Sequence, residues 1–394
     1  MSPIPGSVFR RVLFWAHLSA GVAAGLLILL MSATGVLLAY EKQLVAAAEQ
    51  GNRVAVPADA PMLTAAALAD KALAAAPDAQ RLALVFNLDP AMPVTVTRGR
   101  DTPLLLHPWT GELLPDAAEG IRHFLHEVED LHRWMAGDAR STRASLMHLA
   151  NLLFVFIVLS GLYLWLPAVW RWRAIKPRVV PVVRYVNGKA RDFAWHQSFG
   201  IWMLVPLSVM AGTGVVMSYG WANQLLFAAY GEQVPQRGGP GGGGGGAGPG
   251  GGGAQRPATQ DDAPGARATL DQLLTTARVQ LPDWQRITLP VKPAADAVDI
   301  VAEVPGEGVR LPRRTLTVSA ADASVIKLSP PPTETAAKQT AAQRARTWVR
   351  FAHTGEYYGV IGQTVAALAS LLACVLVYTG LALAWRRLIR PLLA

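Results

Sequence analysis

Four long apolar stretches constrain this chain more than any other feature, because they decide which solvent surrounds it. They contain no Asp, Glu, Lys or Arg and cover Val12 to Tyr40, Leu146 to Leu166, Trp195 to Tyr219 and Tyr357 to Trp385. Each has the roughly 20 residues that a helix needs to cross a hydrocarbon core of about 30 Å. The sequence therefore predicts four transmembrane helices. We expect the first to be an uncleaved anchor, because its apolar run is longer than that of an ordinary signal peptide.

Basic residues cluster on one side of these stretches. Arg10 and Arg11 precede the first stretch, and Arg386, Arg387 and Arg390 follow the last. The loop between the second and third carries seven more, which are Arg171, Arg173, Lys176, Arg178, Arg184, Lys189 and Arg191. Short loops rich in Lys and Arg stay in the cytoplasm. We therefore expect both termini and this loop to be cytoplasmic, and the two long connections to lie in the periplasm of a bacterial inner membrane.

Charge and cysteine content exclude several classes of protein. Much of the formal net charge of +9 sits in the flanks of the apolar stretches, so it needs no nucleic acid to explain it. The single cysteine, Cys374, lies within the fourth stretch. The chain therefore forms no internal disulfide, no cysteine-ligated iron–sulfur cluster and no covalent haem attachment. Any haem must be held noncovalently.

The long connections read as two small α+β modules. Each contains one helical pattern, Thr64 to Ala76 or Leu270 to Val279, followed by short strand patterns. The strands are expected at Leu82 to Leu88, Val94 to Thr97 and Leu104 to His107, and at Gln285 to Leu289, Ala297 to Val304 and Arg314 to Val318. A glycine-rich linker over 238–253 has no strand before it and no helix after it, so it is not a phosphate-binding loop.

These patterns divide the chain into nine segments. We predict cytoplasmic segments over 1–11, 170–194 and 386–394, transmembrane helices over 12–40, 146–169, 195–220 and 357–385, and periplasmic modules over 41–145 and 221–356. The predicted fold class is an integral membrane α-helical protein with two periplasmic α+β modules.

The two halves of the chain repeat one pattern. Thr34-Gly35 follows His17 by 17 residues, and Thr213-Gly214 follows His196 by the same 17 residues. In the closing helices, Ser160-Gly161 follows His132 by 28 residues, and Thr379-Gly380 follows His353 by 26 residues. Such similarity within one chain is typical of membrane proteins built from repeats. The sequence therefore predicts an internal duplication of a unit made of helix, external module and helix.

Several short motifs occur in a characteristic order around the two modules. They are Leu131-His132-Arg133-Trp134, Asn151-Leu152 leading to Ser160-Gly161-Leu162-Tyr163-Leu164-Trp165-Leu166-Pro167, Trp195-His196 with Gly212-Thr213-Gly214-Val215-Val216-Met217-Ser218-Tyr219, and His353-Thr354-Gly355-Glu356. In these motifs the chain resembles the PepSY-associated transmembrane (PepSY_TM) family, and more narrowly its inner-membrane siderophore reductases of the FoxB type. The resemblance implies PepSY-like external modules, two b-type haems and the reduction of ferric siderophores.

His17 and His196 are the candidate ligands of a haem near the cytoplasmic face. Ligand-type residues within membrane helices are costly and are candidates for function. Both helices begin on the cytoplasmic side, so one imidazole from each could bind a haem iron axially. Gly21 and Gly200, one turn further along each helix, would leave room for the macrocycle. The alternative is that both histidines are interfacial residues that bond to neighbouring helices.

His132 and His353 are the candidate ligands of a second haem near the periplasmic face. They match each other in the repeat and in the family motifs, although both precede the apolar core of the next helix, so that their haem would sit high, on interfacial helices. His148, which is nearer the apolar core, is the alternative partner of His353. Arg133 and Arg350 could pair with haem propionates, and an interfacial role facing lipid phosphate explains them equally well.

The remaining histidines give weaker signals. His107 lies at a strand end of the first module. His123 and His126 share an amphipathic segment with three carboxylates, Glu127, Glu129 and Asp130. This segment could bind a metal, but a solvated polar face is the better interpretation.

Two haems would make the chain a transmembrane electron conduit that reduces a periplasmic ferric siderophore. Because no credible nucleotide fingerprint occurs, the electron donor is either a membrane quinol or a separate cytoplasmic reductase. One alternative is a haem-free scaffold that binds a peptide, a protease or a siderophore. A b-type cytochrome that donates to another acceptor is the other.

Overall fold

A computed structural model describes residues 5–79, 81–99, 101–167, 170–181, 184–235, 267–292, 296–305, 311–332, 334 and 338–392. The chain forms two compact units. A helical unit comprises Met1–Glu41, His123–Ala247 and Thr340–Ala394, and a sheet unit comprises Lys42–Arg122 and Gly248–Gln339. The glycine-rich linker predicted over 238–253 lies outside the described residues.

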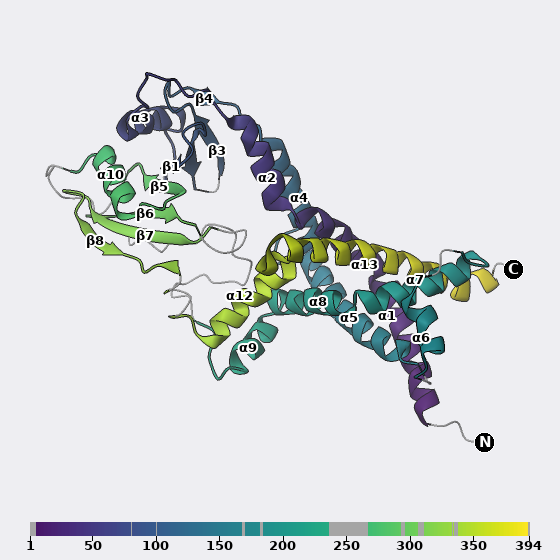
Figure 1. Cartoon of the computed structure of the whole chain (residues 1–394). Helices are drawn as coiled ribbons and strands as arrows, with labels where there is room; N and C mark the ends of the chain where they lie inside the picture. The colour runs from purple at the N-terminus through teal and green to yellow at the C-terminus, as the bar shows by residue number, and fades with distance from the viewer. Residues whose placement is uncertain are drawn as a thin grey trace. The chain divides into compact units, whose positions relative to one another are not determined.

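The helical unit contains the long apolar helices together with shorter ones (Figure 1). Its α-helices are α1 (Pro5–Leu38), most of α4 (Glu119–Trp134), α5 (Thr142–Trp165), α6 (Trp172–Val179), α7 (Gly188–Trp202), α8 (Leu204–Ser218), α9 (Gly220–Ala228), α12 (Ala341–Thr354) and α13 (Gly359–Leu388). Two short 3₁₀ helices, η2 (Glu356–Tyr358) and η3 (Arg390–Leu392), precede and follow α13.

Three described helices, in α1, α5 and α13, are each long and apolar enough to cross a membrane. The helices α7 and α8 pass the same test only as a pair, because the chain bends by 69° between Trp202 and Leu204. Pro206 explains this break. It has no N–H to donate to the carbonyl of Trp202, four residues earlier, so a continuous helix cannot form there. The third apolar stretch is therefore bent, where the sequence analysis expected one uninterrupted helix.

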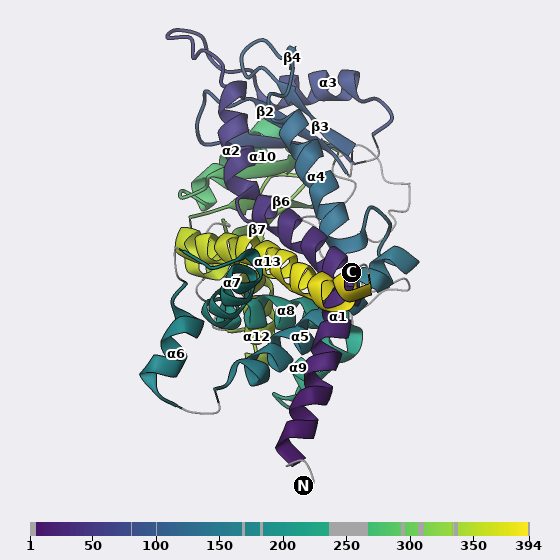
Figure 2. The ribbon, with the colours of Figure 1, turned by 90° about the vertical axis from the view of Figure 1, so that its right-hand side faces the viewer.

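Small residues allow the apolar helices to pack closely. The helix α1 lies along α13 and α5, α8 contacts α5 and α12, and α7 contacts α13 (Figures 1 and 2). Buried alanines, among them Ala24, Ala150, Ala369 and Ala373, occupy these contacts. In membranes, such residues let helix backbones approach one another.

One buried ion pair joins α7 to α13 near the ends of both helices. The fully buried Asp192 accepts hydrogen bonds from Arg386 at 2.5 Å and from Arg191 at 2.9 Å. An unpaired carboxylate would be very costly in this position. The two arginines therefore explain why the carboxylate of Asp192 can be buried on the side of α7 that faces the core.

The sheet unit contains helices and eight strands. Its α-helices are α2 (Glu41–Glu49), which begins at the unit boundary, α3 (Ala65–Ala75) and α10 (Leu270–Gln280), with a 3₁₀ helix η1 (Gln50–Asn52). Its strands are β1 (Ala83–Asn87), β2 (Val94–Arg98), β3 (Asp101–Leu106), β4 (Leu113–Leu114), β5 (Arg286–Pro290), β6 (Ala297–Glu303), β7 (Arg313–Ser319) and β8 (Val325–Leu328).

All eight strands belong to one antiparallel sheet with the order β4-β3-β2-β1-β5-β6-β7-β8. The central pair joins β1 of the first predicted module to β5 of the second, with Val85 opposite Thr288. The two modules, predicted as separate, therefore share one sheet. Each module alone would leave an edge strand unpaired, and pairing β1 with β5 removes both edges.

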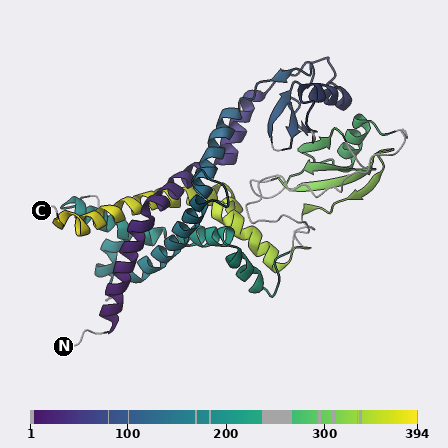
Figure 3. The same ribbon diagram turned by 180° about the vertical axis from the view of Figure 1, so that it is seen from behind.

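The sheet is covered on one face by α3 and α10, as the view from behind also shows (Figure 3). Strand residues alternate between buried and more exposed positions, as in β6, where Val298, Ile300 and Ala302 are buried. A period of two sends these side chains to one face. The carboxylate of Asp271 on α10 accepts hydrogen bonds from the first two backbone N–H groups of α3, so each half of the sheet unit supports the other.

The unit boundaries differ from the predicted modules. The residues from His123 onward, and those from Thr340 to Glu356, belong to the helical unit rather than to modules ending at 145 and 356. The reason is that α4 and α12 each pack one side chain of their last turns onto the apolar helices, at His132 and His353.

Candidate functional site

The helical unit brings four histidines together as two pairs. His17 on α1 faces His196 on α7, with 6.5 Å between the ring centres and 89° between the ring planes. His132 on α4 faces His353 on α12, with 6.4 Å between the ring centres and 72° between the planes. All four residues lie in the helical unit. Each pair thus combines one histidine from the first half of the chain with one from the second half.

The two pairs are separate sites at different levels along one helix. The unbroken helix α1, Pro5–Leu38, carries His17 in its first half and Thr34, the partner of His132, near its end. At 1.5 Å per residue, these 17 positions correspond to about 25 Å along the helix axis. This length approaches the roughly 30 Å of a hydrocarbon core.

Local sequence explains how the second pair is presented. His353 lies in the last turn of α12, which Gly355 ends in the left-handed conformation with a φ of 77°. A side chain at Gly355 would clash with the backbone carbonyl of Gly362, so only glycine fits. His132 likewise lies in the last turn of α4, before Met135 and Ala136 adopt positive φ values. Both short helices therefore end just after the histidine that they carry.

Each imidazole is held by one hydroxyl of an apolar helix. The Nδ1 atom of His17 lies 2.9 Å from Ser160 Oγ, and that of His196 lies 3.0 Å from Thr379 Oγ1. In the second pair, the partners are Thr34 for His132 at 2.9 Å and Thr213 for His353 at 3.0 Å. The same type of bond thus occurs at all four positions.

These hydroxyls determine which ring nitrogen carries the proton. Each one donates its hydrogen to backbone carbonyls three and four residues earlier in its own helix, as Thr379 does to Val375 at 2.9 Å. Toward the imidazole, the hydroxyl oxygen can then only accept, so Nδ1–H is the donor. The carbonyl of Met210, at 2.9 Å from Nδ1 of His353, requires the same tautomer. Nε2 is left with a free lone pair on every histidine.

Glycines next to these hydroxyls leave room for the rings. A Cβ atom on Gly161 would lie 3.3 Å from Cε1 of His17, and one on Gly380 would lie 3.3 Å from Cε1 of His196. For Gly35, the corresponding distance to Cε1 of His132 is 3.6 Å. At the first pair, the Ser/Thr-Gly dipeptides therefore do two things: the hydroxyl orients the imidazole, and the glycine makes space for it. The 3.6 Å at Gly35 is an ordinary contact, and a Cβ atom on Gly214 would meet Asn151 instead of His353.

The donor set and its spacing fit haem iron. Two imidazoles on opposite sides of a metal, with metal–nitrogen bonds of about 2 Å, place their ring centres roughly 6.3 Å apart. The observed 6.5 and 6.4 Å agree with this value. Added Cβ atoms at Gly21 would meet nothing within 4 Å, and at Gly200 only Leu376 at 3.9 Å, so both glycines border open space. A flat macrocycle could occupy such a space.

The second pair is neutral at ordinary pH. Burial lowers the pKa of His132 to about 4, with the nearby His353 adding to the effect. Burial also lowers the pKa of His353 below its usual value. Neutral imidazoles are the form that binds metal, so these two side chains are ready to do so without losing a further proton.

The structure places the other predicted residues away from the pairs or in other contacts. His148 lies against Tyr219, with 5.8 Å between ring centres, and not against His353. Arg133 forms an ion pair with Glu129 at 2.7 Å and lies over the Trp134 ring. Arg350 lies 5.8 Å from the Phe351 ring centre.

The remaining histidines have other surroundings. Nδ1 of His107 accepts hydrogen bonds from the backbone N–H groups of Trp109 and Thr110 in a turn. His123 and His126 are exposed and lie near Glu127 and Asp130 at 3.7 and 3.8 Å. Within the described part of the chain, no group of three or more His, Cys, Asp or Glu residues could hold a metal ion. The exposed side chains of His123 and His126 lie on a solvated polar face.

The hydroxyl partners of the histidines were not predicted from the sequence, in which Thr34, Ser160, Thr213 and Thr379 served only as markers of the repeated pattern. The signal was present, because a Ser or Thr followed by Gly occurs at four matched positions within apolar helices. Polar residues in such helices usually bond to another helix.

One comparison with known protein families gives a match. The profile described as the PepSY-associated TM region matches residues 14–387. No curated protein matches the chain.

Proposed function

This chain belongs to the PepSY-associated TM family, and we propose that it is a di-haem membrane oxidoreductase that reduces a periplasmic ferric siderophore. The observation that carries the proposal is the presence of two histidine pairs whose ring centres are separated by the distance that axial ligation requires. We further propose that the halves arose by duplication, and that α7 and α8 together form the third of four membrane spans.

His17 with His196, and His132 with His353, would hold the two b-type haems. When bound, each haem supplies a one-electron iron couple. The four hydroxyls keep Nδ1 protonated, so that Nε2 of each histidine would be available to bind the iron. Bonds of this kind orient a metal-binding imidazole and raise its basicity. Two histidine ligands also leave no open coordination position, which favours electron transfer over oxygen binding.

The direction of electron flow follows from the proposed orientation. Arginines and lysines flank the ends of the helices on the His17 side, so we place this side in the cytoplasm of a bacterial inner membrane. A membrane quinol or a cytoplasmic reductase would donate electrons there. The sheet unit would lie in the periplasm.

Reduction would release the iron from its chelator. One electron converts the ferric ion of the siderophore to the ferrous ion, and the chelator itself is not altered. Hard oxygen donors hold the ferric ion tightly and the softer ferrous ion much less well. The product is therefore ferrous iron that can leave the complex.

Optical spectroscopy of the purified chain tests the cofactor. Protein from cells supplied with haem should show a Soret band and sharp bands of six-coordinate b-type haem after reduction. His196→Ala and His353→Ala should each remove about half of this signal, whereas His148→Ala, a matched control within an apolar helix, should not. A colourless but folded protein would contradict the proposal and favour the haem-free scaffold.

Anaerobic mixing tests the substrate. The reduced protein should be reoxidised by ferric siderophore in a stoichiometry of one electron per iron, and a ferrous-specific indicator should detect the released metal. If every ferric chelate leaves the reduced spectrum unchanged, the chain is instead a cytochrome for another acceptor.

A further inference from the structure

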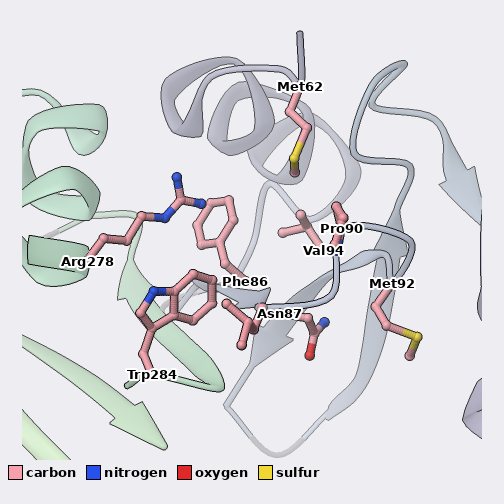
Figure 4. Close-up of a pocket in the computed structure, with 9 residues that line it drawn as sticks. Met62, Phe86, Asn87, Pro90, Met92, Val94, Arg278 and Trp284 are labelled. Carbon is pink, nitrogen blue, oxygen red and sulfur yellow. The ribbon is translucent and has the colours of Figure 1, made fainter. Parts of the chain in front are cut away.

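A cavity in the sheet unit has no part in the proposed electron path. It has a volume of about 260 Å³ and lies where β1, the start of β2 and the end of α10 meet. Its lining comes from both halves of the sheet unit, with Phe86 and Val94 from the first and Arg278 and Trp284 from the second (Figure 4). The pairing of β1 with β5 therefore creates it.

The floor of the cavity is apolar and partly aromatic. Phe86 is 3% exposed, Val94 2% and Trp284 8%, so all three side chains are fixed by the core. Met62 and Leu88, which are 37% and 49% exposed, lie at its rim. Figure 4 shows Phe86, Trp284 and Arg278 around the cavity, and the guanidinium of Arg278 lies over the Trp284 ring. Rigid aromatic faces of this kind favour the stacking of a planar ring.

Arg278 is the one ionisable residue in the lining. Its guanidinium lies 5.4 Å from the centre of the Trp284 ring, and it forms no hydrogen bond or ion pair with the described residues. The carboxylate of Asp271, on the same helix, accepts bonds from α3 instead. Burial lowers the pKa of the guanidinium, yet an arginine stays protonated in proteins. This positive charge, which is exposed to solvent and attracted by Asp271, therefore borders an aromatic floor.

We propose that this cavity binds a small aromatic anion, whose ring lies on Phe86 and Trp284 and whose carboxylate or catecholate oxygens accept hydrogen bonds from Arg278. A guanidinium binds such paired oxygens in a bidentate manner. The volume lies below the 300–1,000 Å³ or so that is usual for drug-sized ligands, so a single ring is the appropriate size. No acidic residue in the lining opposes the negative charge.

Two sources carry this chemistry. One is a free aromatic acid. The other is an aromatic arm of a ferric chelate. Only this second ligand depends on the function proposed above. It would narrow the substrate class to anionic aromatic siderophores, in preference to uncharged or cationic hydroxamate complexes.

Binding measurements on the full-length chain in detergent test the proposal. The probes are 2,3-dihydroxybenzoate, its ferric complex and, as an uncharged control, benzamide. By equilibrium dialysis, we expect saturable binding of one or both anionic probes and at least tenfold weaker binding of benzamide. Arg278→Gln should weaken binding of the anions at least tenfold. Lys327→Gln removes an exposed charge from β8, outside the cavity, and should leave it unchanged.

Several results distinguish the two ligands from each other and this proposal from the proposal of haem binding. Tighter binding of the ferric complex would identify the chelate arm as the ligand, and binding of the acid alone would identify the free acid. Met62→Trp, which fills the rim, should abolish binding of both. The proposal is overturned if neither anion binds, or if the Arg278→Gln and Met62→Trp variants bind as the wild type does. Because His17→Ala should bind the acid normally, loss of haem would not be mistaken for failure of this site.

Discussion

The hydroxyl of Thr379 should control how firmly the first histidine pair holds its haem. Thr379→Val keeps the shape of the side chain but removes the oxygen that accepts the Nδ1–H of His196 at 3.0 Å. Loss of such a partner typically costs 10- to 100-fold in metal affinity. A backbone carbonyl can also accept a hydrogen bond from the Nδ1–H group of such a histidine. The carbonyl of Met210, 2.9 Å from Nδ1 of His353, is an example.

For this reason we expect a loss near the lower limit, about tenfold in haem affinity or roughly 1.4 kcal/mol. The reduction potential of the haem should also rise, because an imidazole that loses the hydrogen bond of its Nδ1–H group donates less charge to the ferric ion. Haem titration followed at the Soret band gives the affinity, and a potentiometric titration gives the potential. These readouts distinguish orientation of the ligand from a general loss of stability.

Thr347→Val is the matched control. Thr347 is exposed on α12, and its hydroxyl donates to the carbonyl of Gln343 four residues earlier at 3.0 Å, as helical threonines do, but no histidine is near it in the described contacts. This variant should keep the wild-type affinity and potential. If Thr379→Val also keeps both while His196→Ala loses the haem, the hydroxyl does not set the tautomer and our reasoning about all four hydroxyls is wrong.

Three further changes test the packing. Gly161→Ala places a Cβ atom 3.3 Å from Cε1 of His17 and should lower haem retention at the first pair, although alanine favours helices. Asp271→Ala removes the carboxylate that caps α3 and should destabilise the sheet unit by about 1–2 kcal/mol in chemical denaturation. Arg386→Met leaves the buried Asp192 with only Arg191 and should cost about 2 kcal/mol, less than a wholly unpaired charge, as a lower thermal midpoint.

Each of these changes has a control of the same type. Gly120→Ala adds a Cβ atom that meets nothing within 4 Å and should retain all haem. Asp283→Ala and Arg390→Met remove charges for which the described residues show no ion pair, so they should leave stability within about 0.5 kcal/mol of the wild type. Equal effects of a test variant and its control would contradict the contact assigned to it.

Much of the helical unit could be predicted because the bilayer restricts what a sequence can do. Apolar stretches of sufficient length identify membrane helices from composition alone. The family was also evident from short motifs, and the match over residues 14–387 confirms it. The bend between α7 and α8 could have been predicted from Pro206, since the missing N–H is a local property of the chain.

The positions of His132 and His353 relative to the membrane helices could not be judged from their distance along the sequence. Both residues precede the apolar core of the next helix, which suggested that their haem would sit high, on interfacial helices. In the structure, α4 and α12 end next to the hydroxyls of Thr34 and Thr213. Separation along the chain says little about distance once a helix folds back.

The sequence by itself determined the membrane helices, the family and the four matched histidines, because hydrophobicity, length and repeated spacing are properties of consecutive residues. The tertiary structure decided which histidines face each other, which hydroxyl holds each ring, and that β1 pairs with β5 in one sheet. These are contacts between residues far apart in the sequence, such as Val85 and Thr288 or His132 and His353. They depend on how whole helices and strands pack, and no local pattern encodes that.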